Sequence, residues 1–355
     1  MKKCAILIVL FCTLGLIART GGSSTSSAGA GVAPYSDVRD LDVSAYSLGL
    51  DLIRTLWFNE NTKWSQGDAA YASQVMDQGK NPGLLVKSLL HAVGIQGTGV
   101  NVAIIDQNMF LDHPEFVGKI VEYADFGCNM TEGSMHGPAV TSLLVGSTIG
   151  TAPGARVYYA AVPSWKLDAT YYADALNWII TRNAQLAEGN KIRVVSVSAA
   201  PSDSLYANGA LWDQARSLAE AAGILVLDCT TTQGIIKRCY YDVDKPDVVS
   251  MCTPGTPQSP YSQCAAESEP KIHAPSSLRT QAEHYKAGVF SFQYTGVGGL
   301  SWAIPYVAGV LAMGWQLRPD MTGDEMVNGL RYSAHKKGGC DIINPLFFIF
   351  WVIMR

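Results

Sequence analysis

The sequence lacks the features that mark several large classes of proteins. Its longest basic run is a pair and its formal net charge is −4, which argues against a nucleic-acid-binding surface. Charged residues make up only 16% of the chain against 48% hydrophobic ones, so material for a core is ample. The six histidines are scattered from His91 to His335 and show no zinc-type spacing with cysteine. Neither an internal repeat nor a metal site is indicated.

Long apolar runs are also scarce, and the first one is informative. Lys2-Lys3 precedes a 15-residue apolar run, Cys4 to Ala18, which is short for a membrane-spanning helix. A Gly/Ser/Thr/Ala tract of linker composition follows from Thr20 to Gly31. We therefore interpret residues 1–30 as an export signal with a linker. Cleavage of this signal and its retention as a membrane tether, through residues 4–18, are both left open, so the chain is expected to be secreted or held at the cell surface.

Six cysteines lie outside this signal, and four of them fall within residues 229–264. An exported chain permits disulfides, but four cysteines allow three connectivities and buried thiols are the alternative. We expect the 229–264 segment to be a surface excursion near the functional cleft. If it holds a disulfide, we expect the link among Cys229, Cys239, Cys252 and Cys264.

Strands and helices are predicted to alternate after an irregular extension, residues 31–80. Near-continuous apolar strands are expected at 100–105, 155–162, 192–197 and 223–227, with helices at 136–145, 168–183 and 211–222. This order favours a three-layer, doubly wound α/β domain over residues 81–355, with a mostly parallel sheet and helices on both faces. The apolar end of the chain, 345–354, is expected to pack as a last strand or helix. Ligands of such sheets bind beyond the carboxyl ends of the strands.

Three polar residues stand where that crevice is expected. Asp106 ends the first apolar strand, His136 opens a helix, and Ser301 follows Gly298-Gly299-Leu300 at the start of a buried apolar helix, 302–317. A helix N-cap is the ordinary interpretation of such a serine. A serine hydroxyl becomes a nucleophile when a histidine takes its proton, and a carboxylate behind the histidine fixes its tautomer. The three residues supply this chemistry in the order Asp, His, Ser.

The surrounding motifs resemble those of the subtilisin-like serine proteases, the subtilase family (peptidase family S8). The resemblance rests on Gly97-Thr98-Gly99-Val100 leading to Asp106, on His136-Gly137, on Gly150-Thr151-Ala152-Pro153, and on Ser301-Trp302-Ala303-Ile304-Pro305. It implies that Asp106, His136 and Ser301 form a catalytic triad, with His136 within hydrogen-bond reach of both others. Gln107-Asn108 and Pro138 depart from the family pattern without removing a proton-transfer group.

The resemblance is weaker at the oxyanion hole. The family carries an asparagine in an Ala-Gly-Asn-x-Gly run, and this chain has Thr230-Thr231-Thr232-Gln233-Gly234, which places Thr232 at that position. A hydroxyl can donate a hydrogen bond, and the Ser301 backbone N–H is a second donor. Gln233 is the alternative donor if the alignment slips by one, and a plain polar turn is the remaining interpretation.

Ser198, Ala199 and Ala200 match the family's substrate-binding backbone, where a peptide adds as a strand. The resemblance thus implies an exported serine endopeptidase with a protein or peptide substrate, no nucleic-acid partner and no cofactor for the chemistry; a structural calcium is left open but not indicated. The alternative is a catalytically degenerate subtilisin-like fold that binds peptides or regulates. A Rossmann-type nucleotide binder is disfavoured because no G-x-G-x-x-G follows the first strand.

Overall fold

The computed structural model describes residues 31–129, 133–265 and 270–355. Its centre is a parallel five-stranded sheet with the strand order β3-β4-β2-β5-β6. The strands are β2 (Asn101–Asp106), β3 (Ile120–Asp125), β4 (Arg156–Ala161), β5 (Ile192–Val197) and β6 (Leu225–Leu227). Because β2 lies in the middle of the sheet, all six of its residues are buried. The predicted α/β class is confirmed.

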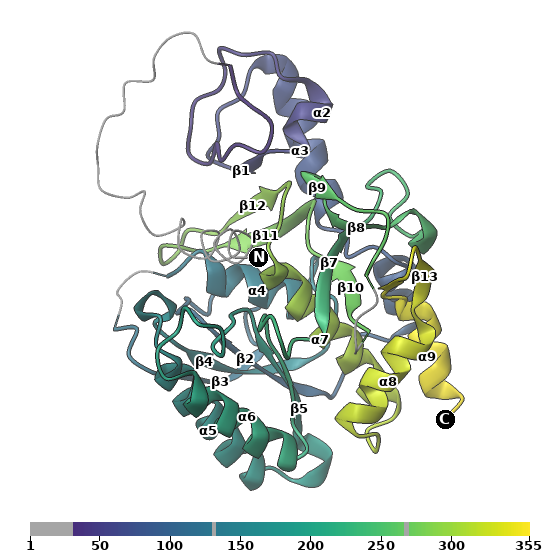
Figure 1. Cartoon of the computed structure of the whole chain (residues 1–355). Helices are drawn as coiled ribbons and strands as arrows, with labels where there is room; N and C mark the ends of the chain where they lie inside the picture. The colour runs from purple at the N-terminus through teal and green to yellow at the C-terminus, as the bar shows by residue number, and fades with distance from the viewer. Residues whose placement is uncertain (1–30, 130–132, 266–269) are drawn as a thin grey trace.

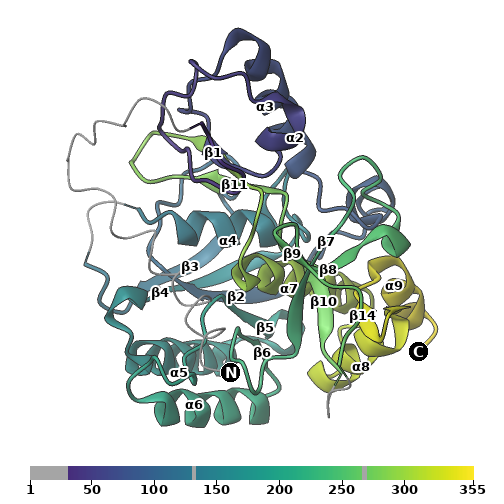
Figure 2. The ribbon, with the colours of Figure 1, turned by 45° about the horizontal axis from the view of Figure 1, so that its top comes forward.

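Alternate residues of β2 face two different helical layers. Val102 and Ile104 pack in one apolar cluster with the helices α4 (His136–Val145) and α7 (Leu300–Leu317). Ala103 and Ile105 pack in a second cluster with α5 (Ala169–Gln185) and α6 (Gly209–Ala221), which lie side by side in both ribbon views (Figures 1 and 2). Strand periodicity therefore explains why this sheet needs helices on both faces.

A second sheet corrects one prediction. It has the strand order β13-β14-β10-β7-β8-β9, with β7 (Ile236–Tyr240), β8 (Thr253–Thr256), β9 (Ser259–Pro260), β10 (Ile272–Pro275), β13 (His335–Lys337) and β14 (Cys340–Ile342). Residues 229–264 supply three of these strands, and Ile236 and Cys239 of β7 lie in the main core. The prediction of a surface excursion is wrong: the charged Lys237 and Arg238 stand between the two buried residues of this strand, so its sequence shows no apolar strand pattern.

The disulfide likewise differs from the predicted pairing. It joins Cys264 to Cys340, so only one of the four predicted cysteines is used and its partner lies on β14. The two cysteines are 76 residues apart in sequence, so the disulfide links the second sheet covalently to the C-terminal part of the chain. Cys239 and Cys252 are buried thiols.

The extension, residues 31–80, is more regular than predicted (Figure 1, purple). It contains α2 (Gly49–Ile53), β1 (Trp57–Asn59) and α3 (Gln66–Gly79), and the Ser65 side chain caps α3 by accepting from the Asp68 backbone N–H. Strand β1 pairs antiparallel with β12 (Ser291–Thr295), which forms a hairpin with β11 (Arg279–Glu283). The extension is therefore hydrogen-bonded to the domain that follows it.

This junction reaches the segment that leads into α7. The Gly296 N–H donates to the Leu56 carbonyl at 2.9 Å. A Cβ at Gly296 would lie 2.3 Å from the Thr55 carbonyl oxygen, so the close approach of the two backbones requires glycine. Tyr294 on β12, two residues before Gly296, is buried in the apolar cluster of the extension. The extension thus supports the strand that precedes the predicted nucleophile.

The C-terminal elements are α8 (Gly323–Ser333) and α9 (Pro345–Ile353), so the apolar end of the chain is a helix. Among the described residues, one helix is long and apolar enough to cross a membrane, namely α7, and 83% of it is buried inside the protein. Burial on that scale marks α7 as the core helix of the domain. The predicted signal and tether, residues 1–30, lie outside the described residues.

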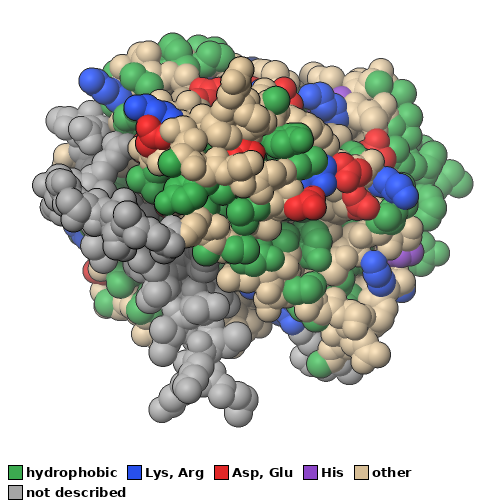
Figure 3. Space-filling model, turned by 90° about the horizontal axis from the view of Figure 1, so that it is seen from above, with side chains coloured by type: hydrophobic (Ala, Val, Ile, Leu, Met, Phe, Trp, Pro, Cys, Tyr) green, Lys and Arg blue, Asp and Glu red, His purple; other side chains and the backbone are tan. Residues whose placement is uncertain are grey.

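Seen from above, the surface carries Lys and Arg side chains close to Asp and Glu side chains, with apolar side chains between them (Figure 3). This mixture agrees with the small net charge of the sequence. It gives no sign of a basic patch on that face.

Candidate active site

The buried Asp106 and the partly exposed His136 form a hydrogen-bonded pair. Asp106 ends β2, where its carboxylate is 4% exposed and accepts the Gln107 backbone N–H at 2.8 Å. His136 opens α4, and its Nδ1 lies 2.7 Å from Asp106 Oδ1. A carboxylate can only accept, so Nδ1 is assigned as the proton carrier and Nε2 is left available as a base. The predicted contact between these two residues is present.

Ser301 lies in the first turn of α7, which begins after Gly299. A Cβ at Gly298 would lie 1.6 Å from the Ser276 carbonyl oxygen, so this approach to the helix requires glycine. The Ser301 side chain is 7% exposed. Within the described part of the chain, its Oγ donates to the Ser198 carbonyl at 3.2 Å and has no hydrogen bond to His136. The second predicted contact is therefore not formed in this structure.

Ser198 fixes the start of α7 through two hydrogen bonds with Ser301, each hydroxyl donating to the other residue's carbonyl. Pro305 has no N–H, so the carbonyl four residues before it, that of Ser301, receives no helical hydrogen bond. The Ser198 hydroxyl donates to that carbonyl at 2.8 Å. The proline within the helix thus explains why a serine follows β5 at this point.

Trp302 connects the serine helix to the histidine. Its ring stacks on the His136 ring, with centroids 5.1 Å apart and an interplanar angle of 30°. Trp302 directly follows Ser301 in α7, so this contact places the start of α7 beside the Asp106–His136 pair. Three segments far apart in sequence therefore meet at the carboxyl ends of β2 and β5.

The groups behind Asp106 remain neutral over a wide pH range. Burial raises the pKa of the Tyr123 phenol to about 12 and that of the Cys128 thiol to about 12. Burial, helped by the charge of Asp106, raises the pKa of Tyr159 well above its usual value. The Tyr159 hydroxyl donates to the Gln107 carbonyl, next to the carboxylate. Asp106 is consequently the charged partner of His136 in this region.

The loop of residues 228–234 differs in character from this pair. Thr231, Thr232 and Gln233 are exposed and form a turn after β6. The Thr231 hydroxyl donates to Asp203 at 2.7 Å, and Gln233 Oε1 accepts from Arg216 at 3.1 Å. Thr232 is therefore flanked by two anchored neighbours. Gln233, the alternative oxyanion donor, is directed toward Arg216.

Asp228 anchors the other end of the loop. Its carboxylate accepts from Trp212 Nε1 at 3.1 Å, from the Thr230 backbone N–H at 3.0 Å and from Arg216 at 3.5 Å. Burial raises the pKa of Asp228 although Arg216 and these donors oppose the shift. Arg216 thus contacts both ends of the loop from α6.

The predicted substrate strand lies directly against this loop. The Ala199 carbonyl accepts the Cys229 backbone N–H at 2.8 Å, and the Ala200 carbonyl accepts the Asp203 backbone N–H at 3.0 Å. Ala199 and Ala200 are half-buried, whereas Ser198 is buried. The three residues follow β5 at the same sheet edge as Asp106.

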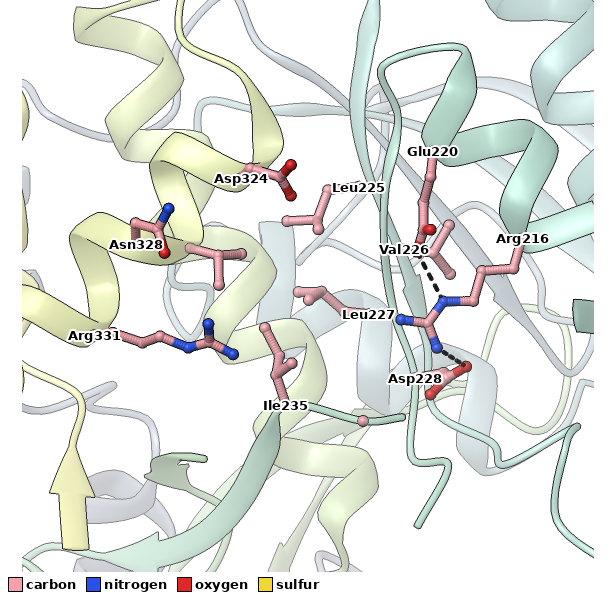
Figure 4. Close-up of a pocket in the computed structure, with 12 residues that line it drawn as sticks. Arg216, Glu220, Leu225, Val226, Leu227, Asp228, Ile235, Asp324, Asn328 and Arg331 are labelled. Atoms are coloured by element: carbon pink, nitrogen blue, oxygen red, sulfur yellow. Dashed lines mark hydrogen bonds and ion pairs between the residues drawn. The ribbon is translucent and has the colours of Figure 1, made fainter. Parts of the chain in front are cut away.

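A cavity of about 390 Å³ lies on the far side of the loop (Figure 4). Residues of α6, β6 and α8 line it, and Arg216 extends into it while bonded to Glu220 and Asp228. Asp106, His136 and Ser301 are not among its lining residues. The cavity is therefore separate from the predicted triad.

One group of metal-type ligands converges within residues 31–129, 133–265 and 270–355. It consists of Cys264, His273 and Cys340, whose ligand atoms lie within 4.8 Å of one another. Both cysteines are joined in the disulfide, so their thiolates are not available as ligands here. This group lies on the second sheet and not beside His136.

The sequence motifs located Asp106, His136 and Ser301, but the roles of other residues were missed. Ser198 was assigned only to substrate binding, although its position after an apolar strand and the proline in the serine helix could have indicated the bond to Ser301. The serine-helix motif contains Trp302 but indicates no role for it. Arg216 and Asp203 carry no local sequence signal, because their loop contacts depend on the fold.

Comparisons with known proteins agree with this arrangement. A sequence model described as the subtilase family matches residues 97–344. Subtilisin E of Bacillus subtilis is 25% identical over 258 residues, which cover 69% of this chain and 63% of that protein. Subtilisin of Bacillus pumilus is 25% identical over the same length, covering 69% of this chain and 87% of that protein.

Two solved structures share the fold. The prenylagaramide maturation protease PagA is 18% identical, with a TM-score of 0.52, and the match covers 75% of this chain and 98% of that one. Fervidolysin of Fervidobacterium pennivorans, a keratinolytic enzyme related to subtilisin, is 15% identical, with a TM-score of 0.53; the match covers 78% of this chain and 47% of that one. The family match covers the strand of Asp106, the helix of His136 and the helix of Ser301, and the chain belongs to the subtilase family.

Proposed function

We propose that this chain is a serine endopeptidase in which Ser301 is the nucleophile, His136 the general base and then acid, and Asp106 the orienting carboxylate. The observation that carries the proposal is the 2.7 Å bond between His136 Nδ1 and Asp106 at the end of β2. This bond leaves Nε2 free to take a proton, beside a helix that presents a serine in its first turn.

Hydrolysis would follow the acyl-enzyme route. Ser301 Oγ attacks the peptide carbonyl carbon as its proton passes to His136 Nε2, and the C–N bond then breaks as the leaving amine takes that proton. Water, deprotonated by His136, then attacks the resulting ester, and His136 returns the proton to Ser301 Oγ as the ester C–O bond breaks. The Ser301 hydroxyl, bonded to the Ser198 carbonyl in this structure, turns to Nε2 for the first step. Catalytic hydrogen bonds are often unformed without substrate, so this resting position is compatible with the route.

The substrate would be a protein or peptide that adds as a strand along Ser198, Ala199 and Ala200. A peptide added as a strand at this edge would bind by main-chain hydrogen bonds with limited side-chain selectivity. The Ser301 N–H in the first turn of α7 and the Thr232 hydroxyl are proposed as the oxyanion donors. Export through residues 1–30, with secretion or a membrane tether, belongs to the same proposal.

A fluorophosphonate probe tests the nucleophile directly. The purified full chain should be labelled at one site, and Ser301→Ala should abolish both labelling and hydrolysis of a peptide library. Ser301 is mostly buried, so Ser276→Ala, which removes a neighbouring buried hydroxyl, serves as the control that keeps the label. Labelling that persists in Ser301→Ala would contradict the assignment.

The second candidate is a degenerate fold that binds peptides without cleaving them. The exposed Thr232 turn, in place of the family's asparagine, is the observation that favours it. A chain that binds library peptides and is never labelled at Ser301 would establish this alternative.

A further inference from the structure

Trp302 stands beside the proposed nucleophile, where the family motif usually has methionine. Its indole is 5% exposed and stacks on the His136 ring at a centroid distance of 5.1 Å. His136 keeps 14% of its side chain exposed. One face of the imidazole is therefore covered by an aromatic surface, while Nδ1 is held at the edge by Asp106.

The burial of Trp302 leaves its indole N–H without a hydrogen bond, which packing alone does not explain. Within the described residues, its Nε1 is buried and has no hydrogen-bond partner. A buried donor without a partner destabilises a fold, and buried indole N–H groups usually find one. Trp315, thirteen residues along the same helix, is the contrasting case, because its Nε1 donates to the Met321 carbonyl at 2.9 Å. A requirement for the aromatic face over His136 explains why a tryptophan is tolerated here.

We propose that Trp302 is a positioning residue that stabilises the imidazolium form of His136 by stacking. The face of an indole carries negative electrostatic potential and attracts a cation placed over it. Because His136 becomes a cation when it takes the Ser301 proton, the contact strengthens during the reaction and favours the transition state. The proposal deepens the proposed function and rests on it for its catalytic meaning, although the stacking itself can be tested without catalysis.

The other groups around His136 stay constant in the test. Asp106 on β2 is its charged partner, while Tyr123, Cys128 and Tyr159 behind the carboxylate are neutral at assay pH because burial raises each pKa. Ser301 on α7 is uncharged. A change in the titration of His136 on substitution of Trp302 therefore reports the ring contact.

The first experiment measures the titration of His136 by NMR in the full chain carrying Ser301→Ala. His136→Gln identifies its ring signal among the six histidines. We expect Trp302→Leu to move the midpoint to lower pH by about half to one pH unit, because the imidazolium loses its stacking partner. Trp302→Phe keeps an aromatic face and should retain most of the wild-type midpoint.

Trp315→Leu is the matched control, since it removes a buried tryptophan from the same helix without touching His136. It should lower the melting temperature and leave the midpoint in place. An unchanged midpoint in Trp302→Leu, an equal shift in Trp302→Phe, or an equal shift in Trp315→Leu would each overturn the proposal. If Trp302→Leu does not fold, Trp302→Met provides the same comparison with the residue usual in the family.

The second experiment places the substitutions in the chain with Ser301 intact. The acidic midpoint of the pH profile of kcat/KM should fall in Trp302→Leu by the same amount, and the plateau should drop roughly 2- to 10-fold. A shift in the NMR titration without any hydrolysis by the wild type would sustain the stacking and reject the proposed function. Hydrolysis by the wild type, with a pH profile of kcat/KM that Trp302→Leu leaves unchanged, would sustain the proposed function and reject the stacking proposal.

Discussion

The two sides of Ser301 are built in opposite ways. On one side, Asp106 and His136 are fixed by a central strand, a buried helix and the Trp302 ring. On the other, the 228–234 loop carries exposed threonines and is held from outside by Arg216 and Asp203. The first side follows the family motifs, whereas the second carries Thr232 at the position of the family's asparagine. Proton transfer is assigned to the rigid side, so substitutions there are expected to lower the rate most, and substitutions on the loop side are expected to have smaller effects.

The largest effect should come from Asp106→Asn on the rigid side. An asparagine can present an N–H to Nδ1, which reverses the tautomer and removes the base, so kcat should fall by about 10⁴-fold. Steady-state hydrolysis of a reporter peptide measures this loss. Asp112→Asn is the matched control, because Asp112 forms another Asp–His bond, 2.6 Å to His284, away from the site. A fall of less than tenfold in Asp106→Asn would remove the contrast between the two sides.

Thr232→Val on the loop side should have a smaller effect. The substitution keeps the shape and removes the hydroxyl, and the loss of one oxyanion donor costs about 10²–10³ in kcat with little change in KM. Thr232→Asn should keep or raise activity. If Gln233→Ala reduces kcat while Thr232→Val does not, the donor is Gln233 Nε2, which must turn away from Asp213 Oδ1 during catalysis.

Arg216→Met tests whether the loop is held from outside. The Arg216 guanidinium contacts Glu220, Asp228 and Gln233, so its loss should let the loop move and lower kcat roughly three- to tenfold. Arg182→Met, which breaks a 2.7 Å pair with Glu122 of β3 at the opposite edge of the sheet, should leave kcat unchanged. Equal effects of the two substitutions on kcat would show that the loop needs no such anchor.

The smallest effect concerns the pH dependence of stability through Asp228. Burial raises its pKa in the folded state, so the fold binds this proton more tightly than the unfolded chain does. The wild type should therefore lose stability relative to Asp228→Asn as the pH rises from about 4 through the folded pKa. Urea unfolding at pH 4 and pH 7 measures the difference. A constant difference would mean that Arg216 fully compensates the buried charge.

The sheet was predictable because its residues follow simple rules. Val102, Ala103, Ile104 and Ile105 are apolar on both faces, which is typical of a parallel strand between helices. The hairpin of β11 and β12 escaped prediction because Arg279, Thr280, Gln281 and Glu283 are polar and yet buried. Their partners include residues of the extension and of the segment after α4: the Thr280 hydroxyl donates to the Met76 carbonyl at 2.6 Å, and the Arg279 guanidinium donates to the Ile149 carbonyl at 3.3 Å. Burial of this kind depends on long-range contacts that no local pattern reveals.

At the site, the sequence was informative where chemistry demands a particular residue type. Asp106, His136 and Ser301 stand in recognisable motifs, and the structure bonds the first two. Thr232 could be located only by counting from β6, and among the residues that the structure describes it has no hydrogen bond that would define its direction. The contacts of Ser198 and Trp302 arise from the crossing of α7 with β5 and α4, which sequence spacing does not encode.

The reciprocal bonds between Ser198 and Ser301 join residues 103 positions apart. A chain made from its N-terminus therefore completes the strands of Asp106 and Ser198 and the helix of His136 long before the nucleophile is synthesised. Until α7 packs between the sheets, His136 has no Ser301 hydroxyl beside it to deprotonate. Under the proposed function, a nascent chain is harmless to itself and to its neighbours, and the capacity to cut proteins begins only with the closing of its own core.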